Sequence, residues 1–71
     1  MNQTINNLQH QVESALMQDS TTQDYGFEVL DSNGVITLRG TVPNRKIREQ
    51  AEFIARGVAG VTSVINELDV M

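Results

Sequence analysis

The dipeptide Asn33-Gly34 constrains the fold of this 71-residue chain more than any other feature. It lies at the junction of residues 27–31 and residues 34–42, two short segments that we expect to form β-strands. A two-residue type I′ turn requires positive φ at both central positions, which Asn and Gly adopt more readily than other residues. The sequence therefore predicts a β-hairpin with Asn33 and Gly34 at its tip.

The register of this hairpin follows from its side chains, because a shift by one residue would exchange the two faces. With Asn33-Gly34 as the loop, apolar residues oppose apolar ones and an acid opposes a base. The expected pairs are Val29 with Leu38, Leu30 with Thr37, Glu28 with Arg39, and Phe27 with Gly40. We therefore expect Arg39 to contact Glu28, and Gly40 to make room for the ring of Phe27.

Two amphipathic helices flank the hairpin in the prediction. Apolar residues recur at i, i+3 and i+4 spacing over residues 4–18 and again over residues 45–58. Asn2 or Thr4 is the candidate N-cap of the first helix, and Asn44 is the candidate N-cap of the second.

A third strand is predicted over residues 62–70, after Gly57 or Gly60 ends the second helix in a left-handed conformation. Pro43 ends the strand before that helix, because proline cannot donate to a β-ladder. Asn66 falls on the apolar face of the third strand, where a buried amide requires hydrogen-bond partners.

The predicted fold class is α+β, a two-layer αββαβ sandwich with both helices on one face of a three-stranded mixed sheet. A right-handed crossover would make the second and third strands parallel, whereas the sequence leaves open which of the two hairpin strands pairs with the third. We expect one domain over residues 1–71, with a core of about 4–70. The chain contains no cysteine, so packing must supply its stability.

Charge is distributed unevenly along the chain, whose formal net charge is −4. Residues 1–38 contain five acids and no Lys or Arg, whereas residues 39–48 contain four cations and no acid. The acidic total argues against nucleic acid as a partner.

The four cations are a candidate binding site for anions or lipid. Three of them occupy the first turn of the second helix, where the helix dipole disfavours positive charge by about 0.3–1 kcal/mol each. One interpretation is that they bind phosphate or an anionic phospholipid headgroup. The alternative is charge balance with neighbouring acids such as Glu49 and Glu52. The four are Arg39, Arg45, Lys46 and Arg48.

A second candidate site is the sheet face that the helices do not cover. Leu30, Val35 and Ile65 are expected to point outward there, either as an interface with a partner domain or a second copy, or through β-propensity alone. Tyr25 and Phe53 lie off the main apolar stripes. They could extend this apolar patch, but we expect them to be partly buried instead.

Nothing in the sequence predicts catalysis. His10 is the only histidine and is expected on the surface, so no catalytic set, metal site or cofactor is predicted. The chain as given carries no secretory signal and no transmembrane segment. It is expected in the cytoplasm as written, or in the periplasm or envelope if it is a module of a longer chain.

Two blocks of sequence resemble the BON domain, a bacterial envelope-associated module. The first is the text N-G-V-I-T-L-R-G-T-V-P at residues 33–43. The second is the pattern G-V-x-x-V-x-N-x-L-x-V at residues 60–70, preceded by Ala51 and Ala55 in the second helix. The resemblance implies an αββαβ fold and a non-catalytic module that binds phospholipid surfaces. It also implies settings such as stress-response and channel-associated proteins, and a potassium-binding branch leaves potassium sensing as an alternative.

Overall fold

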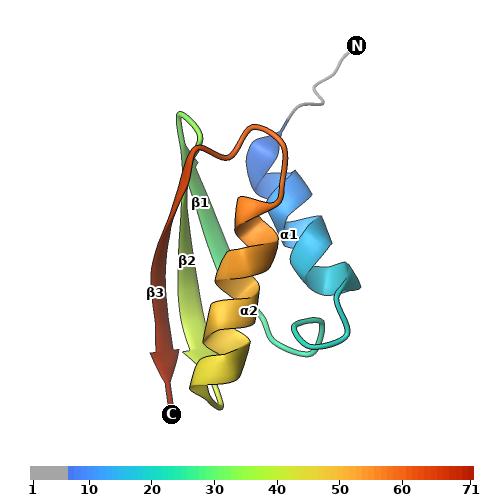
Figure 1. Ribbon diagram of the computed structural model, residues 1–71, viewed down its shortest axis with the longest axis vertical. Coiled ribbons are helices and arrows are strands. Elements are labelled where there is room, and N and C mark those ends of the chain that lie inside the picture. Colours follow the sequence, from blue (N-terminus) through green and yellow to red (C-terminus); the bar gives the residue numbers. More distant parts are fainter. Residues whose placement is uncertain (1–6) are drawn as a thin grey trace.

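The structure is a computed structural model, and it describes residues 7–71. The elements in chain order are α1 (Leu8–Gln18), β1 (Glu28–Ser32), β2 (Val35–Val42), α2 (Arg45–Arg56) and β3 (Ser63–Val70). Both helices cover one face of a three-stranded sheet (Figure 1). The predicted αββαβ sandwich is confirmed.

The sheet has the order β1-β2-β3, with β1 and β2 antiparallel and β2 and β3 parallel. The pairing of the third strand, which the sequence left open, is therefore with β2. This order leaves β1 and β3 as the two edge strands, and each edge has one helix beside it, α1 near β1 and α2 near β3.

The hairpin has the predicted turn and register. Both loop residues have positive φ, 52° at Asn33 and 91° at Gly34. Glu28 lies opposite Arg39, and Val29 lies opposite Leu38. The register predicted from the sequence is confirmed. Turn geometry and side-chain pairing both favour this register.

The prediction that Gly40 makes room for the ring of Phe27 is wrong. β1 begins at Glu28, so Phe27 is not a paired residue of the strand. Gly40 has a φ of 148°, and a Cβ added there would lie 3.1 Å from the carbonyl oxygen of Gly26. Gly40 therefore accommodates the backbone of the segment that enters β1 rather than an aromatic side chain.

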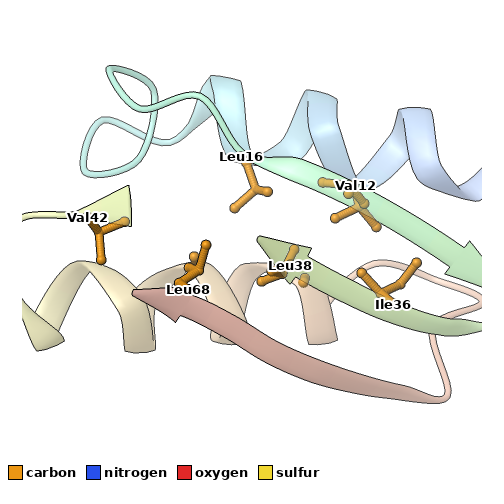
Figure 2. Packing of buried hydrophobic residues seen from close by; sticks show 9 residues of the cluster. Val12, Leu16, Ile36, Leu38, Val42 and Leu68 are labelled. Atoms are coloured by element: carbon orange, nitrogen blue, oxygen red, sulfur yellow. The ribbon is translucent and has the colours of Figure 1, made fainter. Parts of the chain in front are cut away.

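The core lies between the helical layer and the sheet and is aliphatic, as the low aromatic content requires. Figure 2 shows Val12 and Leu16 of α1 near Ile36 and Leu38 of the central strand β2. The fully or almost fully buried apolar residues are Val12, Leu16, Val29, Ile36, Leu38, Val42, Ala51, Ala55 and Leu68.

α1 begins later than expected. Asn7 is its N-cap, and the side chain of Asn7 accepts a hydrogen bond from the backbone N–H of His10. The predicted caps Asn2 and Thr4 lie outside the described residues.

α2 begins at its predicted residue and ends earlier than predicted. The side chain of Asn44 caps it by accepting the N–H of Ile47, as expected. Arg56 is its last residue, and the following Gly57 keeps a right-handed φ of −77°. The left-handed conformation occurs at Gly60, with a φ of 100°.

Candidate functional site

A groove runs along the contact between the first turn of α2 and the last residues of β3. It has a volume of about 610 Å³. We call it the basic groove, and its lining residues are Arg45, Arg48, Leu68, Asp69 and Val70.

Helical geometry explains why two of the cations share this groove and the third does not. Successive residues of an α-helix are rotated by about 100°, so Arg45 and Arg48 lie about 60° apart on the flank of α2 that faces β3. Lys46 is rotated about 160° from Arg48, is exposed, and does not line the groove.

Arg39 lies on the opposite face of the sheet from both helices. It is an exposed residue of β2, flanked on either side by buried Leu38 and half-buried Gly40. The structure therefore does not place Arg39 with Arg45 and Arg48, although the three are close in sequence.

The ion pair of Arg39 also differs from the prediction. Its Nε donates to Oε1 of Glu67 on β3 at 2.9 Å, whereas Glu28 only lies opposite in the register of β1. The hydrogen bond from Glu67 is the main reason that the pKa of Arg39 is raised, and Glu28 adds a smaller electrostatic contribution. The sequence did not indicate Glu67 because its position opposite Arg39 depends on the strand order.

The three cations in the first turn of α2, Arg45, Lys46 and Arg48, have no ion pair within 4.0 Å among residues 7–71. Glu52, one of the acids expected to balance them, pairs with Arg56 at 3.2 Å. Arg48 is half-buried, and its Nε is covered without a hydrogen-bond acceptor in the described part of the chain. The sequence predicts that these cations oppose the helix dipole, and in the described part of the chain no carboxylate lies within 4.0 Å of their charged groups.

Asn66 fixes the first turns of α2 against β3. Its Nδ2 donates to the carbonyl oxygen of Arg48 at 3.0 Å and to Oε1 of Glu52 at 3.2 Å, and its Oδ1 accepts the N–H of Leu68 at 3.1 Å. The predicted inward amide therefore has partners for both its donor and its acceptor, and it connects the two walls of the basic groove.

Sequence reasoning missed the wall that β3 contributes to this groove. Asp69 and Val70 lie beside Thr41 and Val42 in the parallel register, at the end of the sheet where α2 begins. Only the strand order brings them next to Arg45, and a sequence offers no direct signal for that order.

The sheet face without helices carries the expected apolar side chains. Leu30 and Ile65 flank Thr37 across the three strands and are 39% and 47% exposed, and Val35 is half-buried beside them. We call this surface the open sheet face. Phe53 does not extend it, because it belongs to α2 on the other side of the sheet.

Phe53 also departs from its predicted burial. It is 73% exposed, so the expectation of a partly buried side chain is wrong for it. Tyr25, predicted in the same way, is half-buried.

No cluster of possible metal ligands accompanies these surfaces in the described residues. His10 is exposed, and within residues 7–71 no three His or carboxylate side chains come together as metal ligands would. Neither described helix has the length and apolar character needed to cross a bilayer.

The fold and the two sequence blocks define the class of protein. The model of the BON domain family matches residues 4–71, and the chain belongs to this family. It is 38% identical over 64 residues to the outer membrane lipoprotein DolP of Haemophilus influenzae. The match covers 89% of this chain and 33% of DolP, so the chain spans about a third of the length of that relative.

Proposed function

We propose that this domain is a non-catalytic binding module that docks on anionic phospholipid surfaces through the basic groove and the adjacent Lys46. The observation that carries the proposal is that Arg45 and Arg48 line one groove with no carboxylate within 4.0 Å among the described residues. Asp69 also lines the groove, so the local charge is that of three cations and one acid.

Membership of the BON family and the similarity to DolP also support this proposal. The relative is described as an outer membrane lipoprotein, which favours an envelope setting for the longer protein in which such a domain occurs. In an envelope setting, a membrane surface would be available for the basic groove to bind. The stability cost of cations at a helix N-terminus is then explained by their role in binding.

The expected affinity is modest and depends on salt. Each Lys or Arg near an anionic membrane contributes on the order of 1 kcal/mol. Replacing two of them would weaken binding by about 2 kcal/mol, or roughly 30-fold. The attraction decreases with ionic strength because the Debye length is about 10 Å at 0.1 M salt and about 3 Å at 1 M.

Co-sedimentation with vesicles tests the proposal. We expect binding to vesicles that contain anionic phosphatidylglycerol, weak binding to pure phosphatidylcholine, and loss of binding at high salt. The double variant Arg45→Gln/Arg48→Gln should lose roughly 30-fold in affinity for the anionic vesicles.

The matched control is the double variant Arg39→Gln/Arg56→Gln. It removes the same charge, but Arg39 lies on the open sheet face and Arg56 at the far end of α2, about 16 Å along the helix from Arg45. Equal losses in the two double variants would mean that net charge alone acts, and the basic groove would not be the site.

A second candidate function is protein–protein interaction through the open sheet face. The exposure of Leu30 and Ile65 on one row of the sheet favours it. Light scattering after size-exclusion chromatography, over a range of protein concentrations, tests whether a second copy is the partner. We expect a dimer, and we expect Ile65→Lys to dissociate it. A strict monomer at high micromolar concentration would contradict self-association.

A further inference from the structure

A second groove lies at the opposite edge of the molecule, between α1, the segment that enters β1, and β1 itself. Its volume is about 340 Å³, and most of its surface is apolar. We call it the acidic groove, and its lining residues are Glu13, Leu16, Met17, Gln23, Asp24, Tyr25, Gly26, Phe27 and Val29.

The floor of this groove is a continuation of the core. Leu16 of α1 and Val29 of β1 are buried, and Phe27 and Tyr25 are half-buried beside them. Met17 is 69% exposed at the rim, although it is a large apolar side chain. An apolar side chain from another molecule could therefore cover the floor and bury Met17 at the same time.

The negative charge around the groove indicates that a bound molecule would carry positive charge. Glu13 and Asp24 line the groove, and no Lys or Arg occurs anywhere in residues 7–32, which contain α1, β1 and the segment between them. A bound group with positive charge would be attracted, whereas an anionic lipid surface would be repelled.

The backbone of β1 adds a third feature. β1 is an edge strand that pairs only with β2 within residues 7–71. In an antiparallel pair, alternate residues direct their N–H and C=O groups away from the partner strand. These groups are available to an extended peptide that adds a strand to the sheet edge, a recognised mode of peptide binding.

The wall opposite α1 is held in place before any ligand arrives. Thr22 is fully buried in the segment between α1 and β1, and its hydroxyl donates to the carbonyl oxygen of Leu16. Asp19, directly after α1, accepts the N–H of Thr21 at 2.8 Å as well as the hydroxyl of Thr21. A preformed groove reduces the ordering cost of binding.

From these features we propose that the acidic groove binds an extended segment of a partner protein, in which apolar residues alternate with Lys or Arg. The segment pairs with the free edge of β1 and places its apolar side chains over Leu16 and Val29 on the helix side. Its alternate Lys or Arg side chains then point to the open sheet face, where Glu28 is exposed, while Glu13 and Asp24 add to the negative potential around the groove. This site is separate from the basic groove, so it stands whether or not the domain binds lipid.

A synthetic peptide of alternating lysine and valine, blocked at both ends, is the probe. We expect it to shift the backbone amide resonances of α1, β1 and the segment between them in a saturable titration followed by NMR. The same peptide with glutamate in place of lysine should bind at least tenfold more weakly. A version with N-methylated valines, which cannot pair as a strand, should lose binding as well.

Two variants with the same exchange separate the groove from a general effect of charge. Met17→Lys adds a cation at the rim of the acidic groove and should weaken binding of the lysine peptide at least tenfold. Phe53→Lys makes the same kind of change at a similarly exposed apolar residue of α2 and should leave binding unchanged. Neither exchange disturbs the core, because both side chains are largely exposed.

The outcomes are distinct. Equal binding of the lysine and glutamate peptides, equal losses in Met17→Lys and Phe53→Lys, or no binding of the lysine peptide would each overturn the proposal. If the same resonances shift when the protein alone is concentrated, the groove takes a second copy of this chain and the proposed partner is wrong. Failure of vesicle binding would affect only the proposed lipid function.

Discussion

The acidic groove and the basic groove occupy the two edges of the same two-layer sandwich, and their chemistry is opposite. The acidic groove combines Glu13 and Asp24 with an apolar floor beside the edge strand β1. The basic groove combines Arg45 and Arg48 with the last residues of the other edge strand, β3. Each edge of this small sandwich therefore carries a lateral groove, and the stretch of chain that forms the edge sets the charge of its groove.

The two grooves also differ in how their walls are connected. Asn66 joins α2 and β3 through two hydrogen bonds beside the basic groove and makes a third within β3, to Leu68. Around the acidic groove, the buried hydroxyl of Thr22 makes one hydrogen bond to the end of α1. The basic groove should therefore depend more strongly on a single residue, and removal of each connection should affect only its own groove.

The largest effect is expected for Asn66→Ala. Each lost hydrogen bond costs about 0.5–1.5 kcal/mol, so the free energy of unfolding should fall by about 2–3 kcal/mol. Urea denaturation measures this, with Ser63→Ala on the same strand as a control expected to stay within about 0.5 kcal/mol. Under native conditions the variant should bind anionic vesicles less well and the lysine peptide normally, and the reverse result would contradict the division into two sites.

A smaller effect is expected for Thr22→Val, which keeps the shape of the side chain but removes the donor to the carbonyl oxygen of Leu16. Leaving that buried group unpaired should lower the free energy of unfolding by about 1–2 kcal/mol. Thr37→Val on the open sheet face is the matched control. Peptide binding should weaken in Thr22→Val while vesicle binding is retained, and unchanged stability would show that the loop is held by other contacts.

The ion pair between Arg39 and Glu67 should contribute still less. Both side chains are about half exposed, and exposed ion pairs contribute little to stability because water and salt screen them. Glu67→Gln should lower the melting temperature slightly at low salt, and the difference should vanish at about 1 M NaCl. A large loss that persists at high salt would instead indicate a structural role for the Glu28–Arg39–Glu67 row.

The smallest effect is expected in the pH dependence of stability, through Asp19 directly after α1. Hydrogen bonds from Thr21, first from its hydroxyl and then from its N–H, lower the pKa of Asp19 below the reference value of 3.8. A carboxyl with a lowered pKa in the folded state stabilises the fold above 3.8, and this contribution is lost as the pH falls through the folded-state value. Asp19→Ala should therefore be less stable than the parent protein near neutral pH, as measured by urea denaturation. The difference should shrink in strong acid, and a constant difference would contradict this origin.

Local sequence rules predicted much of the fold because each rule acts over a few residues. Asn33-Gly34 set both the turn and the register, Asn44 capped α2 at its predicted position, and the inward Asn66 found partners as a buried amide must. The same rules were less accurate for the starts of elements. α1 begins after Asn7, later than predicted, and β1 begins one residue later than predicted.

The binding surfaces were less predictable, because neighbours in sequence are separated by the sheet or by the turn of a helix. Arg39 lies on the face opposite the helices, and Lys46 lies on a different flank of α2 from Arg48. Conversely, Glu67 reaches Arg39 only because β3 pairs with β2. The exposure of Phe53 also reflects position on the outer side of α2 rather than residue type.

The sequence by itself determined the elements, the hairpin register, the family resemblance and the separation of acidic from basic segments. These depend on turn geometry, side-chain periodicity and charge order, all of which are local. Only the tertiary structure decided the strand order, and with it which side chains share a groove. Strand order depends on how the helices and strands bury their apolar faces together, which is a property of the whole core rather than of any short stretch.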